Sequence, residues 1–384
     1  SFQQLFQPLD HDNVVVRFAA ADQLVDRIGN SAAQPLQAIV ADEDASSRQY
    51  IHALWVLHRL NSLSDELIKR SGNHEDALVR LHTMRILLER DLEPNTYFEL
   101  VSKSLEDDDP HVKRAATELL VKFPQMSALE KALAERGDAS EGDTHQLYTT
   151  RLMLRNLLRD EELMKEVVAK DWKQQDARYL VDVIVGVPSA DAAMFLAKHI
   201  QETDWEGDRL SRLYEHLARF IPAAAIEQAI ATARDTRNRD IDFQYVAFKG
   251  IQSGMARRGS KESPQIHSWG INVATNLLEK YPSGTNDISP EVVAKQKFAA
   301  DLAGKYKIRP LESRLLAFLD DERKANPEVK VSALRSLLIM DTNKHAPLAG
   351  RVLKDTVPSQ FKNEVASMVG DFSGPAINKV LAEV

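Results

Sequence analysis

The side chains best suited to contact another molecule lie in two short runs in the first quarter of the chain. His52, Trp55 and Arg59 follow one another at helical spacing, and His82 and Arg85 repeat that spacing 30 residues later. Trp and Arg gathered in one patch are typical of surfaces that recognise proteins. The alternative interpretation is that Trp55 covers a gap between neighbouring helices, with the charged groups solvated around it. We take these five residues as a candidate partner-binding surface.

The histidines do not predict a metal site. His52 and His58 are six residues apart, which on one helix separates their side chains by most of a half-turn. The acidic run at residues 106–109 lacks the Asp-x-Asp-x-Asp-Gly order of a calcium loop. The absence of cysteine removes thiolate ligands, disulfides and covalent haem attachment. We therefore expect no metal and no cofactor.

Catalytic motifs are also missing from the sequence. It contains no phosphate-binding loop, no Gly-x-Ser-x-Gly elbow and no His-Glu-x-x-His element, so we expect a protein that is not an enzyme. Two basic clusters could bind a phosphate or an acidic partner, but solvated loops explain them better. These clusters are Arg234, Arg237 and Arg239, and Arg257, Arg258 and Lys261.

The elements that must position the candidate residues form a repeated pattern. Four copies lie 33, 30 and 33 residues apart, and a fifth follows near the end of the chain. Each has a helix-capping residue, then a small residue and a leucine one turn apart. The caps are Asn13, Ser46, Asp76, Asp109 and Asn326; the small residues are Ala20, Ala53, Thr83, Ala116 and Ala333; the leucines are Leu24, Leu57, Leu87, Leu120 and Leu337.

A fixed period of this length predicts helix pairs stacked into a solenoid. Short first helices, such as those at 33–40 and 97–105, precede the capped second helices, and Pro110 and Pro327 occupy first helical positions. The small residues and leucines define the buried side of each second helix. His52, Trp55, Arg59, His82 and Arg85 therefore fall on the opposite side, where stacked helices would bring them together.

The rest of the chain indicates further helices with a less regular period. We expect regular repeats over 1–136, diverged repeats with insertions over 137–290, and C-terminal repeats over 291–384, all in one continuous solenoid. Helical patterns cover 147–158, 163–168, 241–259 and 266–281, with polar loops at 257–264 and 282–290. The apolar run 179–187 could be a buried strand, but a helix ending before Pro188 fits its neighbours better.

The capped turn at residues 109–116, Asp-Pro-His-Val-Lys-Arg-Ala-Ala, resembles the HEAT repeat of the phycobilisome-lyase type. A second run, residues 50–57 followed by 76–80 and 87–90, is similar to the HEAT segment of planctomycete-type haem-binding or putative membrane-bound dehydrogenase proteins. That resemblance implies a linking segment of a larger exported bacterial protein with dehydrogenase-like and haem domains. Neither a propeller-like succession of strands nor a haem motif occurs in this chain, so redox activity does not transfer to it.

Composition limits the possible partners and compartments. The formal net charge is −8, which argues against general attraction to nucleic acid or anionic membranes, and no apolar stretch is long enough to span a bilayer. Ser1 without a preceding Met suggests a segment cut from a longer chain. We expect a periplasmic or secreted location, or a cytoplasmic one if the chain stands alone.

The sequence thus predicts an all-α, right-handed solenoid of HEAT-like helix pairs. Its expected function is that of a non-catalytic scaffold that binds a protein partner or the neighbouring domains of a longer chain, without nucleic acid or membrane insertion. The alternative is a HEAT-like enzyme that acts on nucleic acid, as DNA glycosylases do, or a phycobilin lyase-like protein.

Overall fold

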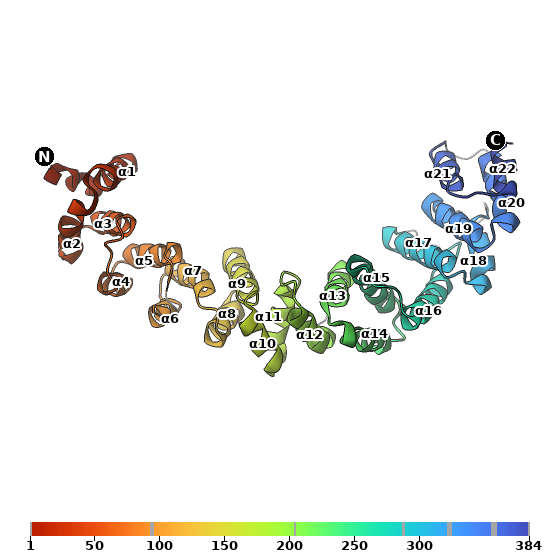
Figure 1. Ribbon diagram of the computed structural model, residues 1–384, viewed down its shortest axis with the longest axis horizontal. Helices are drawn as coiled ribbons and strands as arrows, with labels where there is room; N and C mark the ends of the chain where they lie inside the picture. The colour runs from red at the N-terminus through yellow and green to blue at the C-terminus, as the bar shows by residue number, and fades with distance from the viewer. Residues whose placement is uncertain are drawn as a thin grey trace. The chain divides into compact units, whose positions relative to one another are not determined.

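The computed structural model describes residues 2–92, 96–202, 205–285, 289–320, 325–354 and 359–382. Within these ranges every regular element is a helix and none is a strand, so the expected all-α class is confirmed. The chain divides into two compact units, Ser1–Val187 and Pro188–Val384. Each unit is built from helices that alternate between two layers (Figure 1). Whether the whole chain is one continuous solenoid stays a prediction, as do the three sequence divisions.

In unit 1 the second helix of each repeat packs on its counterpart in the next repeat. Contacts join α3 to α5, α5 to α7, α7 to α9 and α9 to α11, while α4, α6, α8 and α10 belong to the other layer. The helices are α1 (Val14–Gln23), α2 (Ala33–Ala41), α3 (Ser47–Arg59), α4 (Asp65–Gly72), α5 (Ala77–Glu89), α6 (Phe98–Ser104), α7 (Pro110–Leu119), α8 (Met126–Asp138), α9 (Thr144–Leu157), α10 (Glu161–Ala169) and α11 (Gln174–Ile184).

Unit 2 repeats the arrangement with longer helices. The layer of α13, α15, α17, α19 and α21 packs against the layer of α12, α14, α16, α18, α20 and α22. The helices are α12 (Ala190–His199), α13 (Gly207–Phe220), α14 (Ile226–Asp235), α15 (Ile241–Arg258), α16 (Pro264–Lys280), α17 (Pro290–Lys305), α18 (Glu312–Phe318), α19 (Pro327–Met340), α20 (Thr342–Lys354), α21 (Ser359–Val369) and α22 (Pro375–Ala382).

The repeated sequence positions have the roles that their residue types predict. Each of the five caps accepts a hydrogen bond from an amide in the first turn of the helix that follows it. The five aligned small residues and the five aligned leucines are all buried. Pro110 and Pro327 begin α7 and α19, where a missing amide costs no hydrogen bond. The register read from the sequence is therefore confirmed.

The less regular segments also fold as helices. Residues 174–184 form the buried helix α11 and not a strand. Helices α15 and α16 correspond to the expected helices at 241–259 and 266–281, and residues 259–263 of the expected polar loop at 257–264 separate them. The second expected loop, 282–290, lies partly outside the described residues.

Arginine and histidine side chains tie the turns of unit 1 together. Arg80 Nη1 donates to the carbonyls of His74 and Glu75, both 2.8 Å away, and the His74 ring accepts from the amide of the cap Asp76. The remaining guanidinium edge of Arg80 forms a bidentate pair with Asp107 of the next repeat, at 2.7 and 2.8 Å. The same side chain thus satisfies carbonyls of its own turn and joins two repeats.

Helices α13 and α15 of unit 2 approach more closely than side chains normally allow. A Cβ on Gly250 would lie 2.8 Å from the Cβ of Tyr214, and one on Gly254 would lie 2.8 Å from the Cβ of Ala218. Both distances are shorter than a van der Waals contact, so only glycine fits at these two positions. The pair of glycines, four residues apart on one face of α15, sets the spacing of the two helices.

Candidate functional site

Helices α3 and α5 bring Trp55 and His82 into direct contact. The indole Nε1 of Trp55 donates to Nδ1 of His82 at 3.0 Å, and the two rings meet edge to face with centroids 6.2 Å apart. The Trp55 ring also lies edge-on to His58 of its own helix at 5.9 Å. Trp55 is partly buried, so its indole both joins two repeats and keeps an exposed edge.

His52 connects α3 to α1. Its Nε2 accepts a hydrogen bond from Nε of Arg17 at 2.9 Å, and Phe18 lies edge-on to the His52 ring at 5.6 Å. The Phe18 side chain is 57% exposed. An exposed aromatic ring therefore lies next to the predicted histidine.

The two predicted arginines differ in their surroundings. Arg59 forms an ion pair with Asp22 of α1 at 2.7 Å and so helps to hold α1 against α3. Arg85 is exposed, and no partner contacts its guanidinium in the part of the chain that the structure describes. Of the two, Arg85 is the cation available to another molecule.

Both histidines of this surface are held neutral. Burial, together with the charge of Arg17, lowers the pKa of His52 below its usual value. Burial, the charge of Arg85 and the neighbouring His52 lower the pKa of His82 to about 4. Because each ring accepts a hydrogen bond, protonation of that nitrogen would break the link that it makes. The hydrogen bonds of this aromatic cluster therefore require His52 and His82 to be neutral.

We define the unit 1 face as Phe18, His52, Trp55, His82 and Arg85. The structure brings four of the five sequence candidates into this row, and it assigns the fifth, Arg59, to an ion pair at the edge. Sequence reasoning missed Phe18 and Arg17, because the repeat phase identified Ala19 as the counterpart of His52. Side chains on stacked helices meet diagonally. The ring that contacts His52 therefore belongs to Phe18, one residue before the aligned Ala19.

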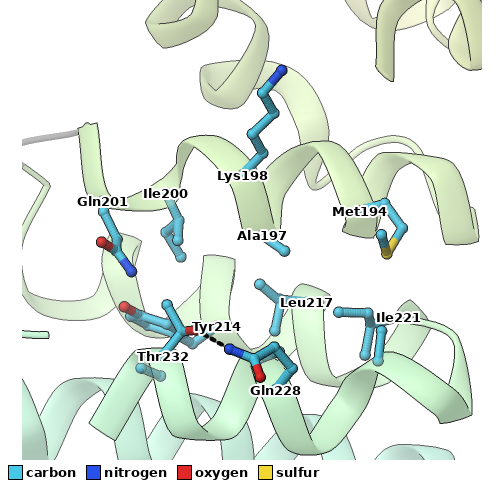
Figure 2. Close-up of a pocket in the computed structure, with 13 residues that line it drawn as sticks. Met194, Ala197, Lys198, Ile200, Gln201, Tyr214, Leu217, Ile221, Gln228 and Thr232 are labelled. Atoms are coloured by element: carbon cyan, nitrogen blue, oxygen red, sulfur yellow. Dashed lines mark hydrogen bonds between the residues drawn. The ribbon is translucent and has the colours of Figure 1, made fainter. Parts of the chain in front are cut away.

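Unit 2 contains a small cleft between α12 and α14, with α13 as its floor (Figure 2). Its volume is about 280 Å³, and most of the side chains around it are apolar. The main groups are Met194 and Ala197 of α12, Tyr214 and Leu217 of α13, and Ile200 and Ile221 beside them. No pattern in the sequence indicates this cleft, because the cleft depends on the separation of two helices.

A larger groove of about 700 Å³ runs between the starts of α13, α15 and α17. Its base holds Asp242, which accepts from Lys280 at 2.6 Å, from Lys295 at 2.7 Å and from the hydroxyl of Tyr281 at 2.8 Å. Burial opposes ionisation of Asp242, but these hydrogen bonds lower its pKa to about 2. Since Lys295 is itself buried and paired, this cluster serves to join α15, α16 and α17.

The described residues show neither a metal-binding group nor a membrane-spanning helix. No group of three or more His, Asp or Glu side chains is placed to hold a metal ion there. No helix among them is long and apolar enough to cross a membrane. The arrangement of the unit 1 face is that of a contact surface, with one exposed ring, partly buried aromatic groups that form hydrogen bonds, and one available cation.

The helix pairs, their caps and their stacking define the class: an α-solenoid of the HEAT type. No family model and no curated protein matches the chain. Among solved structures, it is similar to the karyopherin Kap121p bound to the extreme C-terminus of the protein phosphatase Cdc14p. The TM-score is 0.51 at 13% identity, over 99% of this chain and 52% of the other.

Two further Kap121p structures match at lower scores. Kap121p itself gives a TM-score of 0.48 at 13% identity over 96% of this chain and 48% of the other. Kap121p bound to Pho4p gives 0.48 at 12% identity over 99% and 54%. The chain therefore spans about half the length of the karyopherin chains that it matches. At this identity the likeness is one of fold, and it confirms the solenoid predicted from the repeats.

Proposed function

We propose that this chain is a non-catalytic scaffold that binds a protein partner through the unit 1 face. The observation that carries the proposal is the exposed Phe18 ring, which continues the row of His52, Trp55 and His82 toward solvent. A large exposed ring beside a partly buried Trp and a free Arg has the composition of an interface hot spot. The Kap121p complex with the extreme C-terminus of Cdc14p is an example of a similar fold bound to a protein segment.

The charge of the face indicates the kind of segment that it would bind. Arg85 is the available cation, whereas Arg59 is neutralised by Asp22. Phe18 and Trp55 offer ring surface that an apolar side chain could cover. We therefore infer a partner segment in which an acidic residue accompanies an apolar one.

Photo-crosslinking from the unit 1 face tests this proposal. A photoreactive phenylalanine analogue at position 18 is expected to capture a discrete partner from an extract of the source cells. The same analogue at Tyr148, an exposed position on α9 that is 68% accessible, serves as the control. The proposal is abandoned if both positions capture the same proteins, or if neither captures any.

The captured partner then allows a quantitative test. Phe18→Ala and Arg85→Glu should each weaken its binding about tenfold or more in calorimetric titration, as loss of a hot-spot side chain does. Tyr148→Ala should leave the affinity unchanged. Equal affinities for all three variants would show that the partner binds elsewhere.

We also propose that the chain belongs to a larger exported bacterial protein, on the strength of the run at residues 50–57 and its continuation at 76–80 and 87–90. The fold is compatible with a linking segment, since both units are stacks of helix pairs. Sequencing the complete reading frame tests this: a flanking β-propeller or Cys-x-x-Cys-His motif would support the proposal. A frame that ends close to the present chain would contradict it.

A further inference from the structure

Two hydrogen bonds fix the tautomers of the histidines on the unit 1 face. Nε of Arg17 can only donate, so Nε2 of His52, which lies 2.9 Å away, carries no hydrogen. The indole Nε1 of Trp55 can also only donate, so Nδ1 of His82 carries none. In the neutral state that burial favours, the single hydrogen of each ring then lies on the opposite nitrogen. His52 therefore presents an Nδ1–H donor and His82 an Nε2–H donor.

Both of these donors are open to solvent. Neither nitrogen belongs to the buried side-chain atoms that lack a hydrogen bond, and neither donates to any group in the part of the chain that the structure describes. The acceptor nitrogens of the two rings are already occupied by Arg17 and Trp55. The two histidines thus offer a partner donors only. A segment laid across them gains hydrogen bonds through its carbonyl groups.

The two donors recur at the spacing of the repeats. His52 and His82 occupy the same position relative to the caps of their helices, which are Ser46 and Asp76. Helices α3 and α5 pack against each other, and the axes of packed helices lie roughly 8–10 Å apart. Equivalent groups on the two helices are therefore separated by about 10 Å. A partner that reaches both donors needs carbonyl groups at about this spacing on one side of its chain.

A polyproline II helix has carbonyl groups at this spacing. It has three residues per turn and rises about 3.1 Å per residue, so carbonyls on one side recur after about 9 Å. In a β-strand the same side recurs after two residues, or about 7 Å. Proline suits these donors for a second reason: it has no N–H, so no amide of the segment is left without an acceptor. Its apolar ring can also cover the exposed ring of Phe18.

We propose that the unit 1 face binds a proline-rich segment of its partner in the polyproline II conformation, laid across α1, α3 and α5. Carbonyls one turn apart accept from His52 and His82, a proline ring covers Phe18, and an acidic residue reaches Arg85. The path from α1 to α5 is two helix spacings, or about 20 Å, which roughly six or seven residues of this conformation span. The inference rests on the proposed function, because it specifies the segment that the same face would bind.

Synthetic peptides test the conformation of the segment without the natural partner. The probe is octaproline with a glutamate at one end, made with the glutamate at either end. The control is the same peptide built from D-amino acids, which forms the mirror-image helix. Nitrogen-15 indole signals report binding by NMR, and Trp55→Phe identifies the Trp55 signal. The L-peptide that brings its glutamate to Arg85 should shift this signal saturably and leave that of Trp269, buried in unit 2, unchanged. The D-peptide should bind about tenfold more weakly or worse, since its carbonyls cannot meet both donors.

Methylated histidines test the donors themselves. Nδ1-methylhistidine in place of His52 removes the free donor and keeps the nitrogen that accepts from Arg17. Nε2-methylhistidine in place of His82 does the same and keeps the acceptor for Trp55. Each replacement should weaken the L-peptide about 3- to 10-fold, as loss of one hydrogen bond does. Nδ1-methylhistidine in place of His111, which is exposed on α7, is the control and should leave the affinity unchanged.

Three results would overturn the proposal. Equal binding of the L- and D-peptides would show that ring contacts alone hold the segment. Unchanged affinity in both methylhistidine variants would show that the free nitrogens do not bind carbonyls. The absence of a saturable shift at Trp55 would show that the face does not take a polyproline II segment. If position 18 still captured a partner in that last case, the proposed function would stand and only this inference would fail.

Discussion

Trp55 contributes to the stability of unit 1 as well as to its surface. Its indole lies against His82 of the next repeat and donates a hydrogen bond to it. Removal of a fully buried Trp costs about 3 to 5 kcal/mol, and a partly buried one should cost less. We expect Trp55→Ala to lower the free energy of unfolding by about 2 to 3 kcal/mol, and Trp55→Phe by about 1 kcal/mol.

Urea denaturation followed by circular dichroism measures both effects. Phe18→Ala is the matched control, because its exposed ring should contribute within about 0.5 kcal/mol. A Trp55→Ala protein as stable as Phe18→Ala would mean that the indole does not hold the repeats together. Trp55 would then serve only to contact a partner, and the hypothesis of a binding surface on the unit 1 face would be strengthened.

His82 should make the stability of unit 1 depend on pH. Its pKa is lowered to about 4 in the folded protein, whereas the unfolded chain has the ordinary value of 6.5. The stabilisation is therefore fully present above pH 6.5 and is lost as pH falls from 6.5 toward 4, because the unfolded chain takes up the proton first. Between pH 7 and pH 5 we expect a loss of about 1 to 2 kcal/mol from this residue.

The His82→Gln variant should lose less stability than the parent protein between pH 7 and pH 5. The glutamine amide can accept the hydrogen bond from the Trp55 indole without titrating. The exposed His111→Gln is the control and should behave like the parent protein. Urea curves at pH 7 and pH 5 make the comparison. Equal pH dependence in the parent protein and in His82→Gln would show that His82 is not the titrating group.

At the scale of elements, the contact of α13 with α15 depends on Gly250 and Gly254. A methyl group at residue 254 would press on Ala218 of α13, so Gly254→Ala should destabilise unit 2 by about 1 to 3 kcal/mol. Gly137→Ala is the contrasting change: it lies in helix α8 with open space around it and should stabilise unit 1 by up to about 1 kcal/mol. Calorimetric melting measures the change in stability of each variant. If both substitutions changed stability in the same direction, the packing assigned to α15 would be contradicted.

The sequence predicted the elements better than it predicted the cleft. Caps such as Asp109 and prolines such as Pro110 act on the backbone next to them, so a linear pattern reveals them. The cleft around Tyr214 lies where α12 and α14 are separated above α13. That is a property of several helices together. The same holds for Phe18, whose neighbour His52 is 34 residues away in the chain.

At the scale of the whole molecule, the charge balance bears on nucleic acid binding. With a net charge of −8 we expect duplex DNA to bind no more tightly than about 10⁻⁴ M at physiological salt. Fluorescence anisotropy with a labelled duplex at two salt concentrations provides the measurement. Micromolar binding that persists at the higher salt would revive the enzymatic alternative.

The bidentate pair of Arg80 with Asp107 has a consequence for how unit 1 would respond to force. The same arginine binds the turn of its own repeat and the next repeat, so separating these two repeats breaks this link while the contacts between other pairs of repeats remain. A chain pulled from its ends in an optical trap should therefore lengthen in steps of about one repeat rather than in a single rupture. Unit 1 would then act as a tether that extends in steps under load.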